Sequence, residues 1–150
     1  PINDMNDTRN GEWLDPETAR PGVSAVNAGT GEVLWSHVQE NVCGEGRPFC
    51  DPGVSAAITA TDGAVIAGHL DGIIRIYDRN SGEIIWSYNT TTPVTGTNGV
   101  IAQGGGMSGS GPALGAGHMV INSGYGLYNH EAGNALLVFA PKTTGSVSAR

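Results

Sequence analysis

Short apolar segments flank the same polar turn twice along this chain. Each copy has a hydrophobic residue, an Asn or Asp, three small or polar residues, a glycine, a glutamate, two aliphatic residues and a tryptophan; the copies, Ala25–Trp35 and Ile76–Trp86, lie 51 residues apart. An Asn or Asp side chain can hydrogen-bond to its own backbone two residues on, and a glycine four places later tolerates the positive φ of a tight turn. The pattern therefore predicts two β-hairpins, with turn residues Asn27, Gly31, Asp78 and Gly82.

Both copies end on a tryptophan, Trp35 and Trp86. On the outgoing strand of a hairpin, a large flat side chain can cover the junction between neighbouring sheets while its indole N–H reaches a backbone acceptor. Stacking on a ligand is the alternative, and we favour packing because tryptophan is highly buried on average. These two residues are therefore expected to dock one sheet on the next.

The segment before the second copy predicts two more strands, Ser55–Thr61 and Ala64–His69. Asp62-Gly63 separates them and Asp71-Gly72 follows the second, and Asp-Gly is a strong hairpin signal. With the second copy, these strands form a four-stranded antiparallel meander over residues 55–89. A unit of this kind that recurs about every 50 residues is typical of a β-propeller blade.

The remaining segments fit around this blade. We predict an all-β fold that is part of a β-propeller, with about three blades of four-stranded antiparallel sheet. The predicted division is residues 22–40 as the end of a first blade, 41–54 as a loop bracketed by cysteines, 55–89 as a full blade, 90–110 as a glycine-rich connection, and 111–150 as the last blade with an inserted loop at 127–134. Because a propeller closes its ring with typically four to eight blades, we expect the chain to be a fragment or subunit whose remaining blades come from the same or other chains.

Composition supports this fold and excludes several classes of function. Glycine accounts for 24 of 150 residues and charged residues for 14%, and no apolar stripe has the 3.6-residue period of a helix, so almost no helix is expected. The net charge is −7 with only seven Lys and Arg, which argues against nucleic-acid binding because phosphate neutralisation needs a basic patch. No apolar run reaches the length of a transmembrane helix, so no membrane span is expected.

The two cysteines, Cys43 and Cys50, bracket a loop rich in turn-forming residues. Because no third cysteine and no nearby histidine complete a tetrahedral set, the pair fits a disulfide better than a zinc site, and no metal-binding residue is assigned. Disulfides persist in oxidising compartments, which favours a periplasmic or extracellular location. Two free thiols in a cytosolic loop are the alternative.

Several glycine-containing motifs carry a resemblance to a known family. They are Ile66–Gly72, Arg75–Asp78, Thr97–Val100, Gly104–Gly106, Gly109–Pro112, Asn122–Gly126 and Gly133–Leu137. With these motifs, the segment from Cys50 to Lys142 resembles the C-terminal blades of polyvinyl alcohol dehydrogenases and related PQQ-dependent quinoprotein alcohol dehydrogenases. The tryptophan-bearing hairpins resemble the tryptophan-docking motif of the same superfamily, which also occurs in propellers that bind no quinone.

The resemblance implies a propeller that holds pyrroloquinoline quinone (PQQ) and calcium on its axis, oxidises a small or polymeric alcohol and passes electrons to a cytochrome. It also implies that the catalytic base and the acidic calcium ligands come largely from earlier blades, so no catalytic residue is identified in this chain and its status as an enzyme stays open. The alternatives are a non-catalytic propeller that binds partners and a structural subunit of an extracellular assembly.

The glycine-rich segment from Gly104 to Gly111 is the first candidate for contact with a cofactor. It lacks the Gly-Lys-Ser/Thr ending of a phosphate-binding loop, but the bare backbone of Gly105 and Gly106, followed by Ser108, would permit close approach of a flat cofactor. A flexible connection between blades is the alternative, and general loop behaviour favours it.

The segment Gly124–Asn134, which contains the inserted loop, is the second candidate, because Tyr125 lies near His130 and Glu131 in the sequence. Inserted loops carry function more often than the strands that they interrupt. His130 and Glu131 could serve as a metal-binding or proton-transfer pair only if the loop bends, since adjacent residues of an extended chain face opposite ways.

Arg75 is the third candidate, since it lies among aliphatic residues of a predicted strand. Its guanidinium would suit the carboxylates or carbonyl oxygens of a quinone. A surface ion pair with Asp71 or Asp78 is the alternative, which we favour.

Overall fold

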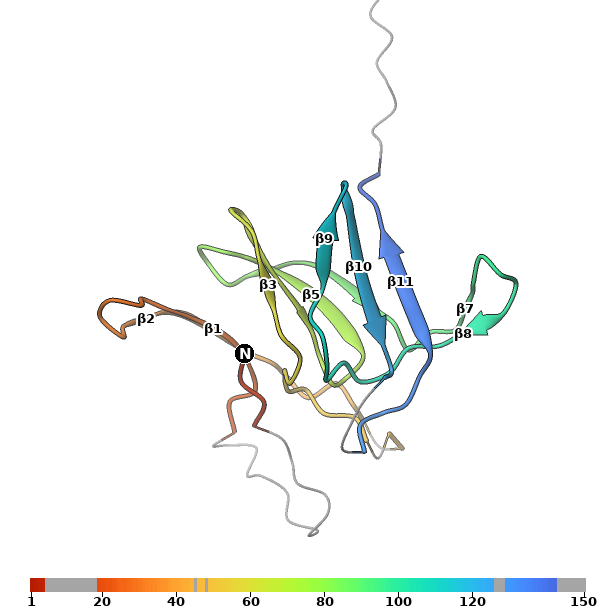
Figure 1. The fold of residues 1–150 in the computed structure, drawn as a ribbon. Helices are drawn as coiled ribbons and strands as arrows, with labels where there is room; N and C mark the ends of the chain where they lie inside the picture. Colours follow the sequence, from red (N-terminus) through yellow and green to blue (C-terminus); the bar gives the residue numbers. More distant parts are fainter. Residues whose placement is uncertain (5–18, 45, 48, 126–128, 143–150) are drawn as a thin grey trace, which may run out of the picture.

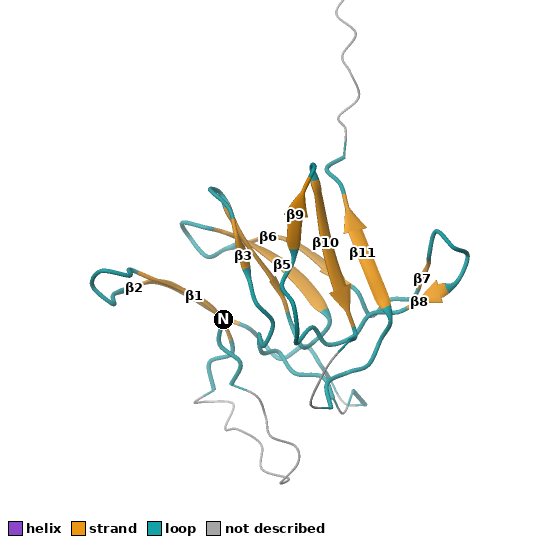
Figure 2. Cartoon of the chain, in the orientation of Figure 1, coloured by secondary structure: helices purple, strands orange, loops and turns teal. Residues whose placement is uncertain are grey.

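The computed structural model describes residues 1–4, 19–44, 46–47, 49–125 and 129–142. All regular structure in these residues is β-strand, as Figures 1 and 2 show. The strands are β1 (Gly22–Val26), β2 (Val33–Val38), β3 (Thr59–Ala60), β4 (Ala64–Gly68), β5 (Ile73–Asp78), β6 (Ile84–Asn89), β7 (Val94–Thr95), β8 (Ile101–Ala102), β9 (Ala113–Gly115), β10 (His118–Ser123) and β11 (Ala135–Phe139). The predicted all-β class is confirmed, and the described part holds no helix that could cross a membrane.

Antiparallel pairing joins these strands into two larger sheets and two hairpins. One sheet has the order β3-β4-β5-β6 and the other the order β11-β10-β9, while β1-β2 and β7-β8 pair only with each other. In Figure 1 the two hairpins project on opposite sides of the larger sheets. This meander of sequential strands is consistent with part of a β-propeller.

The two repeated hairpins share one pairing register. Ala25 faces Trp35 in β1–β2 and the register then shifts at Val26. Ile76 faces Trp86 in β5–β6 and the register then shifts at Tyr77. The same bulge therefore precedes the turn in both copies, which increases the local twist of each hairpin.

The turns of the two hairpins are also built alike. The Gly31 N–H donates to the Asn27 carbonyl over 2.8 Å, and the Gly82 N–H donates to the Asp78 carbonyl over 2.9 Å. Both glycines have positive φ, 76° and 74° respectively. The Asn27 and Asp78 side chains each accept backbone N–H groups two and three residues on, and these bonds lower the pKa of the Asp78 carboxyl.

The tryptophan of the first hairpin lies on the turn of the second. Trp35 Nε1 donates to the Arg79 carbonyl over 2.8 Å. A Cβ atom on Gly82 would lie 2.5 Å from Cε3 of the Trp35 ring, so only glycine leaves room for the indole. Gly82 thus serves both the backbone of its own turn and the contact between neighbouring sheets.

We expect Gly82→Ala to destabilise the fold more than Gly31→Ala. The two glycines have nearly the same φ, so alanine at either site costs the left-handed backbone, about 1–2 kcal/mol. Nothing lies within 4 Å of a Cβ on Gly31, whereas Gly82→Ala also displaces Trp35, which adds about 1–3 kcal/mol of overpacking. Urea denaturation followed by tryptophan fluorescence measures the difference, and equal destabilisation by the two variants would show that the indole contact contributes nothing.

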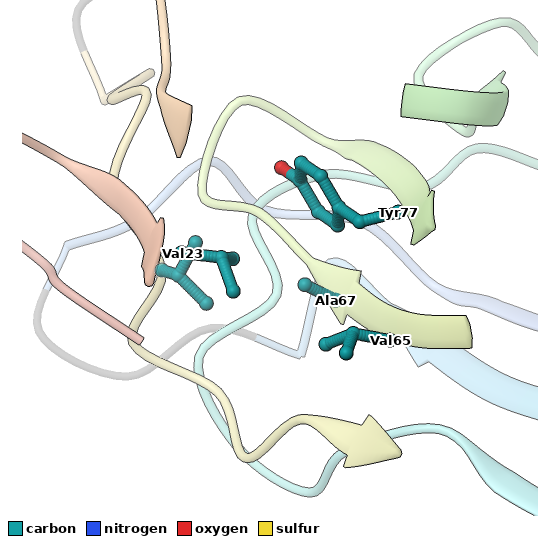
Figure 3. Packing of buried hydrophobic residues seen from close by; sticks show 5 residues of the cluster. Val23, Val65, Ala67 and Tyr77 are labelled. Atoms are coloured by element: carbon teal, nitrogen blue, oxygen red, sulfur yellow. The ribbon is translucent and has the colours of Figure 1, made fainter. Parts of the chain in front are cut away.

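Buried side chains form one hydrophobic cluster on each face of the four-stranded sheet. The first contains Val23, Val54, Val65, Ala67 and Tyr77, and Figure 3 shows Val23 of β1 facing Val65 and Ala67 of β4. The second contains Ile66, Ile74, Met107, Met119 and Ile121. Since successive strand residues point to opposite faces, β4 contributes Val65 and Ala67 to one cluster and Ile66 to the other. Val23 of β1 and Val54 therefore pack on one face of the sheet, and Met107, with Met119 and Ile121 of β10, packs on the other.

The first predicted strand of this blade is shorter in the structure than Ser55–Thr61. Only Thr59 and Ala60 pair with β4, because the chain before them follows the next connection instead. The Ala57 N–H donates to the Gly109 carbonyl over 3.3 Å, and the Thr59 hydroxyl donates to the Pro112 carbonyl. Five of the seven residues predicted as strand thus lie outside the ladder with β4.

The sheet of β9, β10 and β11 has three described strands, where a four-stranded blade is predicted for residues 111–150. Gly117, at the β9–β10 turn, has a φ of 73°, as a tight turn requires. The prediction for 111–150 extends over residues 143–150, and that for the inserted loop includes residues 127 and 128; these positions lie outside the described residues.

Candidate functional site

Buried polar groups gather where four connections meet. The β4–β5 turn meets the glycine segment through the Met107 N–H, which donates to the His69 carbonyl over 3.1 Å. The residue after β6 joins the same turn, because the Thr90 N–H donates to the Gly72 carbonyl over 3.0 Å. The loop before β11 completes the set, since the Gly106 N–H donates to the Glu131 carbonyl over 2.8 Å.

The predicted contact residues Gly105 and Gly106 are buried against the chain's own loop. A Cβ on Gly105 would lie 2.3 Å from the Glu131 carbonyl oxygen, and one on Gly106 would lie 3.1 Å from the His130 Cβ. The close approach that the glycines permit is therefore made by residues 130–132 in this structure. Ser108, further along, is half-buried, and Tyr125 is 58% exposed; contact of these four residues with a cofactor stays a prediction.

Two buried hydroxyls connect the full blade with the next sheet. Thr90 Oγ1 donates to the Gly72 carbonyl over 2.7 Å, and Ser123 Oγ lies 2.7 Å from Thr90 Oγ1. The Gly105 N–H donates to Ser123 Oγ over 3.1 Å. The sequence-based prediction missed both hydroxyls, because Thr90 and Ser123 belong to no repeated motif. Only their hydrogen-bond partners in the folded chain distinguish them from other residues at strand ends.

Arg75 forms a buried ion pair with Asp71. Its Nη1 and Nη2 donate to the two carboxylate oxygens of Asp71 over 3.1 and 2.7 Å. The side chains are 4% and 0% exposed, so the predicted pair with Asp71 is present but is not a surface pair as expected. The reason is that β5 is covered on both faces. The guanidinium is therefore paired with a carboxylate of its own chain.

His69 and Tyr77 form a second buried polar pair. His69 Nδ1 lies 3.1 Å from the Pro52 carbonyl, which can only accept, so Nδ1 carries the proton. Nε2 is then an acceptor, and the Tyr77 hydroxyl, 2.9 Å away, donates to it. Burial, reinforced by the nearby Arg75 charge, lowers the pKa of His69 to about 3, so its imidazole is neutral at pH 7. Burial raises the pKa of the Tyr77 phenol, which keeps its proton.

Glu131 is paired with Arg47, and a metal-binding or proton-transfer role of His130 with Glu131 stays a prediction. The Glu131 carboxylate accepts from the Arg47 guanidinium, and burial lowers the pKa of His130, which keeps its imidazole neutral at pH 7. Within the described residues, no three His, Cys, Asp or Glu side chains are close enough to hold a metal ion. The sequence did not indicate Arg47, because its partner lies 84 positions away.

Two cavities lie elsewhere, one beside Trp35 and the other beside Trp86, which is 36% exposed. One of about 580 Å³ is lined by residues of β1, β2 and the turn after β5, with Trp35 and Arg79 among them. A larger groove of about 1030 Å³ lies between the two larger sheets and is mainly apolar, with Trp86, Tyr88 and Phe139 in its lining. Neither is lined by the predicted contact residues Gly105, Gly106, Ser108, Tyr125 or Arg75.

These observations test whether the described residues fit PQQ and calcium. The guanidinium suited to a quinone carboxylate is already paired, the glycines already face protein backbone, and the described side chains include no cluster of metal ligands. The described part therefore does not form a self-contained site for either group. What it does form is a buried network of hydrogen bonds that joins adjacent sheets.

Comparison with known proteins identifies relatives of this chain. A polyvinylalcohol dehydrogenase of Pseudomonas sp. is 34% identical over 131 residues, which is 81% of this chain and 20% of that protein. A polyvinylalcohol dehydrogenase of Sphingopyxis sp. (strain 113P3) is 36% identical over 120 residues, which is 78% of this chain and 18% of that protein.

The quinohemoprotein alcohol dehydrogenase ADH IIB of Pseudomonas putida is 34% identical over 71 residues, 47% of this chain and 10% of that protein. No family model matches the sequence. The chain spans about a fifth of the length of the polyvinylalcohol dehydrogenases that it matches. The resemblance inferred from the sequence motifs is confirmed.

Proposed function

Because this chain is a relative of the polyvinyl alcohol and quinoprotein alcohol dehydrogenases, we propose that it is a section of a propeller enzyme of that kind. The observation that carries the proposal is the docking of Trp35 on Gly82 between two hairpins of identical register, in a sequence related to these enzymes over about four fifths of its length. A contact of this kind holds one hairpin against the next, as neighbouring blades of a ring require.

In this proposal the complete protein oxidises a small or polymeric alcohol with PQQ and passes the electrons to a cytochrome. The names of the relatives support alcohol oxidation and, for the more distant ones, a quinone. The described residues hold adjacent blades in place, while the remaining blades supply the catalytic base and the calcium ligands.

We also propose a periplasmic or extracellular location. The Cys43–Cys50 disulfide, with an S–S distance of 2.06 Å, supports it, because such bonds persist in oxidising compartments. The disulfide predicted from the sequence is thus present in the structure.

The test is reconstitution of the complete polypeptide with PQQ and Ca²⁺. We expect a change in the quinone absorbance on binding, followed by alcohol-dependent reduction of an artificial electron acceptor and then of a cytochrome c. The apoprotein without PQQ is the control. Absence of both quinone binding and alcohol oxidation would reject the proposal and favour a non-catalytic binding propeller.

A further inference from the structure

The loop closed by the disulfide lies against the loop before β11. Cys43 and Cys50 are joined with a Cα–Cα distance of 5.5 Å, and the Cys50 N–H donates to the Arg47 carbonyl over 3.1 Å. Cys43 is buried, whereas Cys50 is only half-buried. The bond and this internal turn together restrict the backbone that carries Arg47 and Phe49.

Arg47 bridges three segments that are far apart in the sequence. Its Nε donates to Glu131 Oε1 over 3.1 Å, and its Nη2 donates to Glu131 Oε2 and, over 2.8 Å, to the Asp71 carbonyl. The two Glu131 contacts raise the pKa of the guanidinium. One side chain therefore connects the disulfide loop with the β4–β5 turn and with the loop before β11.

The backbone of the disulfide loop also binds Glu131. The Glu131 N–H donates to the Phe49 carbonyl over 3.1 Å, and the Glu131 carbonyl accepts the Gly106 N–H. Glu131 is thus held through its carboxylate, its N–H and its carbonyl, and two of these three attachments come from residues between the cysteines.

We propose that the loop from Cys43 to Cys50 is a redox-dependent clasp. With the disulfide formed, Arg47 and Phe49 hold Glu131 over Gly105 and Gly106; with the disulfide reduced, this hold is released and the glycine segment becomes accessible. The physical reason is that the cross-link removes conformational freedom from the loop, so the same contacts cost more entropy to form without it. The inference concerns how the loop contacts Glu131 and does not rest on the proposed alcohol dehydrogenase activity.

The switching step is a two-electron reduction by a dithiol. One thiolate of the reductant attacks the Cys50 sulfur, the more accessible one, and the S–S bond breaks with Cys43 leaving as a thiolate that takes up a proton. The second thiol of the reductant then attacks the mixed disulfide and releases Cys50 as the second thiol. The reductant ends as a disulfide, and the protein has gained two electrons and two protons.

Hydrogen exchange detected by mass spectrometry on the complete polypeptide tests the clasp, with dithiothreitol as the dithiol. On reduction, we expect exchange to accelerate at least tenfold in peptides that contain the Glu131 and Gly106 amides, and to stay unchanged at Ile74 and Ile76 of β5. Reoxidation should restore the slow exchange. The double variant Cys43→Ser, Cys50→Ser should exchange rapidly without reductant, and direct reduction of the folded wild-type protein serves if that variant does not fold.

Two arginine variants separate the clasp from a general effect of charge. Arg47→Gln should accelerate the same amides with the disulfide intact, whereas Arg79→Gln, which removes an exposed guanidinium that donates only to the Asp62 carbonyl over 3.4 Å, should not. Unchanged exchange at Glu131 and Gly106 on reduction would overturn the proposal. Equal acceleration in β5 would also overturn it, since the disulfide would then stabilise the whole fold and not this loop.

Discussion

Replacing Asp71 with alanine is expected to lower the free energy of unfolding by about 3–5 kcal/mol, the cost of leaving one partner of a buried ion pair uncompensated. The variant leaves the Arg75 guanidinium, 4% exposed, without its carboxylate. It also removes the acceptor of the Ile73 N–H, which donates to Asp71 Oδ1 over 2.9 Å. Urea denaturation of wild-type and variant protein, followed by tryptophan fluorescence, measures the loss.

Two controls show whether the unpaired charge is the cause. The double variant Asp71→Leu, Arg75→Met removes both charges and should be within about 2 kcal/mol of the wild type, because apolar residues of similar size can replace a buried pair. Asp62→Ala removes an exposed carboxylate from a hairpin turn and should change stability by no more than about 0.5 kcal/mol. A loss below 1 kcal/mol for Asp71→Ala would mean that water reaches Arg75.

Lowering the pH from about 6.5 to about 3 is expected to destabilise the fold through His69. The pKa of His69 is about 3 in the folded protein, against 6.5 as its ordinary value. Between these values the unfolded chain binds a proton that the folded chain does not, so stability rises with pH across this window and is lost as the pH falls. The shift corresponds to about 5 kcal/mol at the acidic end of the window.

The variant His69→Gln isolates this contribution. The glutamine amide can donate to the Pro52 carbonyl and accept from the Tyr77 hydroxyl, yet it does not titrate. The difference in unfolding free energy between wild type and His69→Gln, measured at several pH values from 3 to 7, should therefore change sharply below pH 6.5. His118→Gln, at an exposed position, should show no such change. A wild-type minus His69→Gln difference that stays constant across this range would show that His69 is not buried as a neutral group.

Both predictions concern the same end of the central blade. His69 and Asp71 come from the turn between β4 and β5, and Arg75 comes from β5. The partners of His69, Pro52 and Tyr77, lie on either side in the sequence. Each polar group in these pairs is matched, which is what permits burial under two hydrophobic clusters. The network fixes the turn against which the glycine segment and the disulfide loop are placed.

The sequence by itself determined the features that depend on neighbouring residues. The Asn27–Gly31 and Asp78–Gly82 turns follow from local hydrogen bonding and from the positive φ of glycine, and the Cys43–Cys50 bond closes over a separation of only seven positions. The Asp62-Gly63 and Asp71-Gly72 turn signals on either side likewise indicated the strand Ala64–Gly68. Such features need few contacts with the rest of the fold, so a short window of sequence specifies them.

Only the tertiary structure decided what the buried polar residues do. Arg75 is an interior ion-pair partner because sheets cover both faces of its strand, and Gly105 and Gly106 admit a loop of the same chain because residues 130–132 fold back over them. The Ser55–Thr61 segment lost most of its strand to a connection more than 50 positions away, and Arg47 found Glu131 at a separation of 84. Residue types fix what a side chain can bind, but long-range packing selects which partner comes within reach.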